Sequence, residues 1–147
     1  MTRAVRMLAG AIALAAPLAA LADAAVTQPV TNPDFELGFE AIKAKDWDQA
    51  VTLLSRYANV DPVNADAQNL LGYAYRNQKK YELAFRHYRE ALRLDPKHKG
   101  AHEYIGETYL LVGDKAKAQE HLEALERICT RQCEEYQDLA RALAKAK

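Results

Sequence analysis

LGYAYRNQKKYELAFRHYREALRLDP, residues 71–96, is the stretch that decides the fold of this 147-residue chain. Apolar and small residues recur in it three and four positions apart, which is the spacing of a helix that buries one face. The pattern is interrupted near Gln78, resumes at Tyr81 and stops at Asp95-Pro96, because the residue before a proline is pushed out of helical geometry. These residues therefore predict two helices joined by a short turn.

Landmarks of this stretch recur on both sides of it at one constant interval along the chain. They are Gly38, Gly72 and Gly106 in the first helices, Ala50, Ala84 and Ala118 in the second helices, and Pro62, Pro96 and Thr130 at the ends. Small residues at fixed positions let two helix backbones approach closely, and one helix pair cannot bury its apolar face alone. The sequence therefore predicts an all-α fold, a right-handed α-solenoid of three helix–turn–helix pairs.

Residues that favour helix starts and stops flank the expected helices. Asn32 followed by a proline predicts a first helix over about residues 33–45. Gly113 is the expected C-terminal stop of the fifth helix. The other expected N-caps are Asp46, Asn64 and Asp114.

The middle pair carries a specific family signature, formed by Leu71, Gly72, Tyr75, Ala84, Tyr88, Ala91 and Pro96. This set resembles the tetratricopeptide repeat. The resemblance implies three repeats, at residues 31–64, 65–98 and 99–132. The outer copies depart from the family pattern at Ala41, Leu125 and Thr130, where Tyr, Ala and Pro are usual. The resemblance also implies a non-enzymatic protein–protein interaction module, with a protein or peptide as its partner.

Residues 133–147 predict a seventh, amphipathic helix. Its apolar face consists of Tyr136, Leu139, Ala140 and Leu143. The helix resembles the solvating helix that closes repeat arrays of this family, covering the open edge of the last pair. The tail CTRQCEEYQDL is also similar to that of small exported bacterial repeat proteins.

In this family the first helix of each pair lines a concave groove. By their offset from the core Leu-Gly pair, the groove candidates are Phe35, Phe39, Lys43, Asn69, Tyr73, Arg76, Glu103, Glu107 and Leu110. Aromatic side chains with a few polar groups suit an extended or helical peptide. Alternatively, the two phenylalanines pack on the preceding segment or on the second helix. We expect Tyr73→Ala and Arg76→Ala to weaken binding with little change in melting temperature.

A grip on a C-terminal carboxylate, known in the family, is not expected here. It needs Lys and Asn at the positions of Phe35 and Phe39. Its other polar positions hold Leu70, Gly100 and Tyr104. The predicted partner is therefore a protein or peptide that is bound in another way.

The N-terminal segment, residues 1–22, is unlike the rest of the chain. Two arginines precede an uncharged, Ala-rich run over residues 7–22, which ends in a small-residue cleavage pattern. We interpret residues 1–22 as a signal peptide cleaved near Ala22-Asp23, and residues 23–31 as a flexible leader. The mature protein is then periplasmic or secreted. The alternative is an uncleaved membrane anchor, although the run is shorter than the ~20 strongly apolar residues of a spanning helix.

The only two cysteines, Cys129 and Cys133, lie at the junction of the sixth and seventh expected helices. In an exported protein this placement favours a disulfide, which would fix the angle of the last helix. The alternative is a redox-active pair, because Cys133 would lie at a helix N-terminus. The spacing is not C-x-x-C, and no thioredoxin-like strand pattern is present, so the structural role is favoured.

Charge and motifs disfavour several other classes of protein. The formal net charge is zero, which argues against nucleic-acid binding. Residues 67–100 carry eight basic and three acidic side chains between acidic flanks, so a self-associating structural protein, a homo-oligomer, is an alternative function. No phosphate-binding glycine loop, nucleophile elbow or zinc-protease motif occurs. His98 and His102 have no third ligand beside them, so no metal or cofactor is expected, and His102 is expected to pack against the neighbouring pair.

Overall fold

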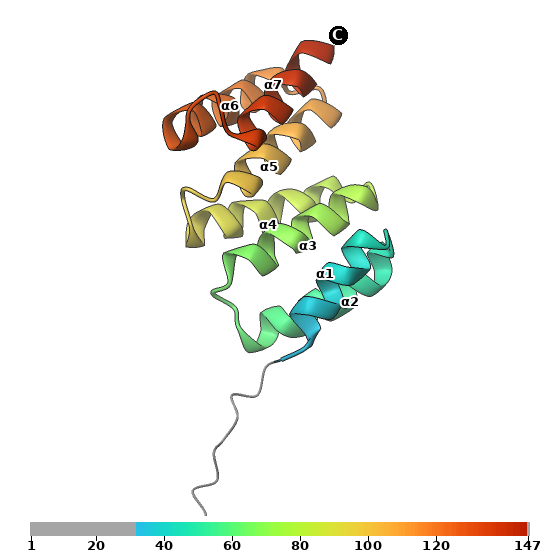
Figure 1. The fold of residues 1–147 in the computed structure, drawn as a ribbon. Helices are drawn as coiled ribbons and strands as arrows, with labels where there is room; N and C mark the ends of the chain where they lie inside the picture. Colours follow the sequence, from blue (N-terminus) through green and yellow to red (C-terminus); the bar gives the residue numbers. More distant parts are fainter. Residues whose placement is uncertain (1–31, 147) are drawn as a thin grey trace, which may run out of the picture. The chain divides into compact units, whose positions relative to one another are not determined.

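The computed structural model describes residues 32–146, and within that range it has seven helices and no strand (Figure 1). The helices are α1 (Asp34–Lys43), α2 (Trp47–Val60), α3 (Ala65–Asn77), α4 (Tyr81–Leu94), α5 (Lys99–Leu111), α6 (Lys115–Cys129) and α7 (Glu134–Lys145). The predicted signal peptide (1–22) and leader (23–31) lie outside the described residues. None of the described helices is long and apolar enough to cross a membrane. The predicted all-α solenoid is confirmed.

The helices form three consecutive pairs, α1/α2, α3/α4 and α5/α6, and α7 lies beside α5 and α6 (Figure 1). Contacts join α1 to α3, α3 to α5 and α5 to α7, whereas within the described chain α2, α4 and α6 do not contact one another. The odd-numbered helices therefore form one continuous layer. We call the surface of α1, α3, α5 and α7 the inner face.

Two of the repeated glycines lie where the first helix of a pair meets the second. A Cβ atom on Gly72 would lie 2.6 Å from ring carbons of Tyr88, and one on Gly38 would lie 2.7 Å from Leu54 Cγ. Gly106 has the equivalent place in the third pair, but there a Cβ would lie 2.6 Å from Leu139 of α7. The third glycine thus makes room for the last helix rather than for its own pair.

Three apolar clusters run along the stack, one over α1–α3, one over α4 and α5, and one over α6 and α7. Their almost fully buried members include Leu54 and Leu71, then Tyr88 and Ile105, then Leu125 and Leu139. Tyr75 of α3 packs against both the first and the second cluster, and Leu110 of α5 packs against the third. Each cluster therefore depends on a neighbouring pair, as expected for a solenoid.

The turn inside each pair contains one residue with positive φ, at the same place in all three repeats. These residues are Lys45, Lys79 and Gly113, with φ of 59°, 61° and 85°. The next residue donates its N–H to the carbonyl five residues earlier, as Asp46 does to Ala41 at 2.9 Å. This bond satisfies a free carbonyl at the helix end. Sequence reasoning found the stop only at Gly113, because only glycine signals a positive φ by its residue type.

Hydrogen bonds confirm three of the expected N-caps. The side chains of Asp46, Asn64 and Asp114 accept a backbone N–H from three residues later, at 3.1, 2.9 and 3.0 Å. At α1, Asn32 Oδ1 accepts the N–H of Asp34 at 3.0 Å, but Pro33 holds the N-cap position. α1 therefore starts one residue later than the expected 33–45, and it also ends earlier, at Lys43.

Candidate functional site

An arginine that packs against two tyrosine rings lies on the inner face. The Arg76 guanidinium carbon is 4.9 Å from the ring centroid of Tyr73 and 5.3 Å from that of Tyr104. Arg76 of α3 also forms an ion pair with Glu107 of α5, and the two side chains are 13% and 28% exposed. We call these four residues the central cluster. Because Arg76 contacts all three other members and the two tyrosine rings also contact each other, the cluster presents a fixed arrangement to a ligand.

Burial of Arg76 revises one expectation from the sequence. A surface arginine would be replaceable with little change in melting temperature, but this one holds Glu107 and packs against two rings. Removing it leaves a partly buried carboxylate without its cation, which destabilises a fold. Arg76 therefore serves the fold as well as the inner face.

Trp47 is a member of this surface that sequence reasoning did not single out. It opens α2, and its ring lies 6.0 Å from that of Tyr73 in an edge-to-face arrangement. Tyr73 in turn lies 4.9 Å from Tyr104. The only sequence signal would have been a large aromatic directly after the N-cap Asp46, which does not reveal a contact with the next repeat.

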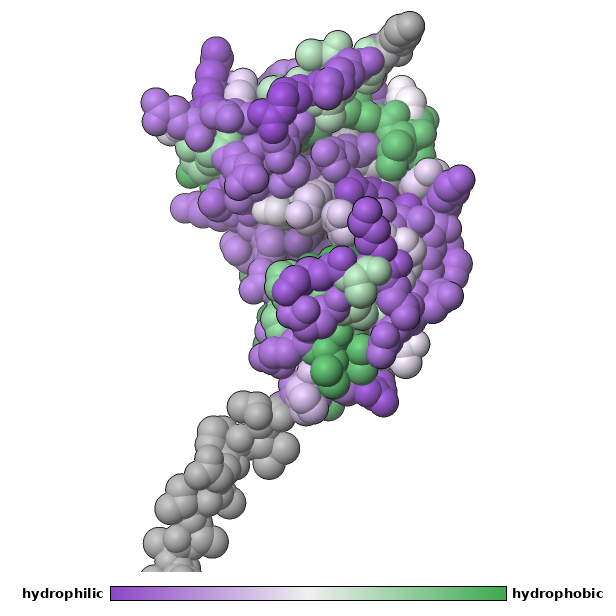
Figure 2. All heavy atoms as spheres, turned by 45° about the vertical axis from the view of Figure 1, so that its right-hand side comes forward, coloured by the Kyte–Doolittle hydropathy of each residue, from purple (hydrophilic) through white to green (hydrophobic). Residues whose placement is uncertain are grey.

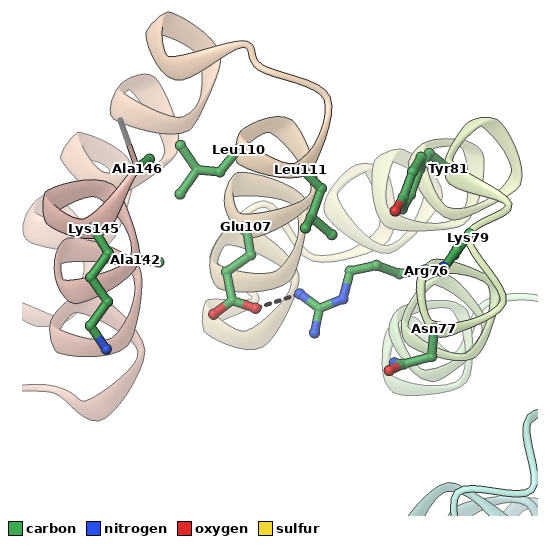
Figure 3. A pocket seen from close by; sticks show the side chains of 10 residues that line it. All are labelled: Arg76, Asn77, Lys79, Tyr81, Glu107, Leu110, Leu111, Ala142, Lys145 and Ala146. Carbon is green, nitrogen blue, oxygen red and sulfur yellow. Dashed lines mark hydrogen bonds and ion pairs between the residues drawn. The ribbon is translucent and has the colours of Figure 1, made fainter.

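A hollow of about 570 Å³ adjoins the central cluster, and we call it the apolar hollow (Figure 3). Leu110 and Leu111 of α5 extend into it, Tyr81 lies on the side of α4, and Ala142 of α7 closes the opposite side. The cationic side chains of Arg76, Lys79 and Lys145 lie around it. This combination of an apolar floor and a polar rim is typical of peptide-binding pockets.

A second hollow, of about 280 Å³, lies between α1 and α3 and is lined by Phe35, Phe39, Asp66, Asn69 and Leu70. The alternative in which phenylalanines pack on the second helix holds for Phe35, whose ring lies 5.1 Å from that of Tyr57. Phe39 remains 45% exposed. Lys43 does not line this hollow; it pairs with Glu40 at 2.8 Å and lies over the Phe39 ring.

A third hollow, of about 210 Å³, lies between α5 and α7, and we call it the acidic hollow. Its lining residues are Gly100, Glu103, Tyr104, Glu134, Glu135 and Asp138. Glu103 is only 8% exposed. Burial raises the pKa of Glu103 to about 7, and the negative charges of Glu107 and Glu135 add to this effect.

The predicted groove residues are thus divided among several places on the inner face. Tyr73, Arg76 and Glu107 meet in the central cluster, and Leu110 lies in the apolar hollow beside it. The remaining candidates apart from Lys43 lie in the two smaller hollows. What sequence reasoning missed is the contribution of α7, which was expected only to cover an edge but supplies lining residues to two hollows.

Exposed hydrophobic side chains gather towards the two ends of the described unit. The large ones are Leu37, Phe39, Val60, Val63, Leu111 and Val112. Figure 2 shows hydrophilic residues over most of one face, with hydrophobic surface both near the start of the described chain and near its C-terminal helices. Leu111 and Val112 are neighbours at the end of α5, yet only Leu111 lines the apolar hollow.

The histidines lie away from these three hollows, and one of them caps a helix. His102 Nδ1 lies 3.0 Å from His121 Nδ1 of its own pair, and its Nε2 lies 3.1 Å from the carbonyl oxygen of Pro96 in the preceding repeat. His98 Nδ1 caps α5 by accepting the N–H of Ala101. Burial lowers the pKa of His121 and of His87 to about 4, so both rings are neutral near neutral pH.

The two cysteines join the last two helices. Cys129 is the final residue of α6 and Cys133 is the N-cap of α7. In the structure their sulfur atoms lie at bonding distance, with 5.8 Å between the Cα atoms. A disulfide at this place would cross the turn between these helices and restrict the direction of α7, which lines both the apolar and the acidic hollow.

The chain resembles long relatives over short stretches. It is 32% identical over 75 residues to the human Protein O-mannosyl-transferase TMTC3, which is 51% of this chain but 8% of that protein. The mouse protein of the same name is 34% identical over 64 residues, which is 44% of this chain and 7% of the relative. The match thus covers less than a tenth of either relative.

Solved structures and family models cover more of the chain. MamA from Desulfovibrio magneticus RS-1 has a TM-score of 0.64 at 25% identity, over 67% of this chain and 56% of that one. The TPR domain of Arabidopsis OM64 has a TM-score of 0.70 at 19% identity, over 76% and 92% of the two chains, and this likeness shows the fold alone. Two models described as tetratricopeptide repeat match residues 35–99 and 75–145. Since these matches together span the three stacked helix pairs, the chain belongs to the tetratricopeptide repeat family, a family of protein–protein interaction modules.

Proposed function

We propose that the inner face holds a segment of a partner protein, and that the chain acts as a non-enzymatic adaptor. One observation carries this proposal: the apolar hollow, of about 570 Å³, lies directly beside the ordered central cluster. The hollow has room for one large apolar side chain of a ligand, and the cluster offers ring faces and hydrogen-bonding groups to the adjacent backbone. Because the rings and the ion pair are already in place, a ligand orders few side chains on binding.

Leu111→Glu should reduce capture of the partner by about tenfold or more. The substitution removes an apolar contact and adds a carboxylate that loses its hydration when the ligand's apolar side chain covers it, and we expect this to cost about as much free energy as a tenfold loss of affinity represents. Leu111 is 58% exposed, so we expect the free energy of unfolding to change by no more than about 0.5 kcal/mol. The measurement is crosslinking capture from an envelope extract with the tagged full-length chain as bait, quantified by mass spectrometry.

Val112→Glu is the matched control. It makes the same change one residue further along, at a side chain that is 48% exposed and does not line the apolar hollow. Capture should be retained in this variant. Equal capture by the wild type, Leu111→Glu and Val112→Glu would reject binding in this hollow. The homo-oligomer that the charge pattern suggests stays a prediction beside this function.

We further propose that the protein works outside the cytoplasm, in the periplasm or as a secreted protein of the small exported bacterial type. The N-terminal pattern of residues 1–22 and the pair Cys129–Cys133 support this, because disulfides persist in oxidising compartments. The intact mass of the protein from the producing cells should correspond to a chain that starts at Asp23 and lacks the two thiol hydrogens. A full-length, reduced chain in the cytoplasmic fraction would contradict export.

A further inference from the structure

The acidic hollow is lined by a largely buried glutamate, Glu103, whose carboxylate has no ion-pair partner in the part of the chain that the structure describes. Of its acidic residues, Glu135 pairs with Lys99 at 3.2 Å and Asp138 pairs with Arg141. Glu103 is 8% exposed and makes no hydrogen bond or ion pair through its side chain within the described residues. Burial of an unpaired carboxylate opposes folding, so this residue is costly where it lies.

The charges that face Glu103 do not neutralise it. From α5 and α7 it faces Glu107, Glu134 and Glu135, and from α3 it faces Arg76. Arg76 is already paired with Glu107, and Lys99, four residues before Glu103 on α5, is already paired with Glu135. The hollow therefore has an excess of negative charge, and an incoming cation would be attracted to it.

The volume of the acidic hollow and the distances between its possible ligand residues favour an organic cation over a bare metal ion. Within the described residues, the one group of His, Cys, Asp and Glu with metal-ligand spacing is Cys129, Cys133 and Glu135, which does not include Glu103 and whose two sulfur atoms lie at bonding distance from each other. A volume of about 210 Å³ instead suits the end of a long side chain. The ring of Tyr104 also lines the hollow, and aromatic faces attract ammonium and guanidinium groups.

We propose that the acidic hollow binds the cationic end of an arginine or lysine side chain of the partner segment, with Glu103 as its counter-ion. This inference rests on the proposed function, since the same segment occupies the apolar hollow. The absence of a Lys–Asn carboxylate grip agrees with it, because this end of the inner face attracts cations instead of a terminal carboxylate.

The two hollows also set a spacing for the ligand. Glu103 and Leu110 are seven residues apart on α5, which corresponds to about 10 Å along the helix. An extended peptide covers about the same distance in three residues. The preferred segment therefore has a basic residue about three positions from a large apolar residue.

The test uses two blocked synthetic peptides, acetyl-Arg-Ala-Ala-Leu-amide and the same peptide with citrulline, the neutral isostere, in place of arginine. Their affinities for the full-length chain are measured by calorimetry at a pH about one unit above and one unit below the pKa of Glu103, which is about 7. At the higher pH the arginine peptide should bind about tenfold more tightly, as expected for one buried charge-assisted contact. At the lower pH the preference should weaken, because the raised pKa of Glu103 means that its carboxyl group is then mostly protonated.

Glu103→Gln should abolish the preference for arginine while the chain stays folded. With a folded-state pKa of about 7 against the ordinary 4.5, the charge of Glu103 costs stability increasingly as the pH rises through this range. The variant should therefore melt at the same or a higher temperature than the wild type at the higher pH. Glu123→Gln, an exposed residue of α6 outside the hollows, is the control and should keep the preference.

Equal binding of the two peptides, binding of neither, or a preference that survives in Glu103→Gln would each overturn the inference. The proposed function is judged separately. If Leu111→Glu loses the partner while the arginine preference is absent, then the inner face is the binding surface and only the role of Glu103 is wrong.

Discussion

Tyr88→Ala should lower the free energy of unfolding by about 3–5 kcal/mol, the range for removing a fully buried aromatic side chain. Tyr88 has no exposed surface and belongs to the middle apolar cluster, between α3 and α5. Its ring fills the space above Gly72, where even a Cβ would lie 2.6 Å away. No neighbouring side chain can replace it from that side, because glycine has none, so the cavity is expected to persist. Denaturant unfolding followed by circular dichroism measures the loss.

Phe39→Ala is the control for Tyr88→Ala. It also deletes an aromatic ring, but this ring is 45% exposed and lies outside the three apolar clusters. Its loss should cost about 1 kcal/mol or less. Similar losses in the two variants would show that the middle pair does not hold the stack together.

Arg76→Ala should lower the free energy of unfolding by about 2–4 kcal/mol, less than the loss of Tyr88 but more than a surface arginine would cost. Breaking a partly buried ion pair leaves Glu107 without its cation, and Glu103 on the preceding turn adds a second carboxyl group. The substitution also removes a guanidinium that packs against two tyrosine rings. Thermal and denaturant unfolding near neutral pH would measure both losses together.

Arg93→Ala is the matched surface variant. Arg93 forms an ion pair with Glu90, in which the two side chains are 66% and 36% exposed. Because water screens the charges of this exposed pair, Arg93→Ala should destabilise the fold much less than Arg76→Ala does. If Arg76→Ala is no more destabilising than Arg93→Ala, the central cluster is an ordinary solvated ion pair and does not preorganise the inner face.

Tyr88 and Arg76 show that the fold and the binding surface depend on the same side chains. Tyr88 supports α3 and α5 from the outer layer, and Arg76 connects the same two helices on the inner face. Loss of either would change the relative position of the walls of the apolar hollow. Variants at these positions therefore cannot by themselves identify the ligand contacts, whereas Leu111 and Val112 can, because their side chains are exposed.

Local patterns predicted the fold because a repeat uses the same local rule in each copy. The constant repeat interval, the small residues at Gly38 and Gly72, and three of the N-caps all act within one pair or between adjacent pairs. Prediction from the sequence was weaker where residues of different types adopt the same backbone conformation. Lys45 and Lys79 adopt the positive φ of Gly113 because the hydrogen bonds of the turn compensate for it, and nothing in the residue type signals this.

The sequence predicted which positions line the site, but not which of these side chains pair with one another. The family offsets placed Tyr73, Arg76 and Glu107 on one surface, where the structure has them in contact, yet they could not distinguish a paired carboxylate from an unpaired one. Glu107 has a cation and Glu103 does not, although both lie on α5 one turn apart. That difference depends on which side chain of α3 reaches across, and on where α7 lies.

The sequence by itself determined the helices, their pairing and their order, because amphipathic periodicity and small residues at close contacts act over short distances along the chain. Only the tertiary structure decided that Gly106 lies against α7, that Arg76 packs against two tyrosine rings, and that four acidic side chains surround one hollow. The physical reason is that burial and charge pairing depend on the distance between side chains from different repeats. Residues far apart in the sequence, such as Arg76 and Glu107, become neighbours only after the pairs have stacked.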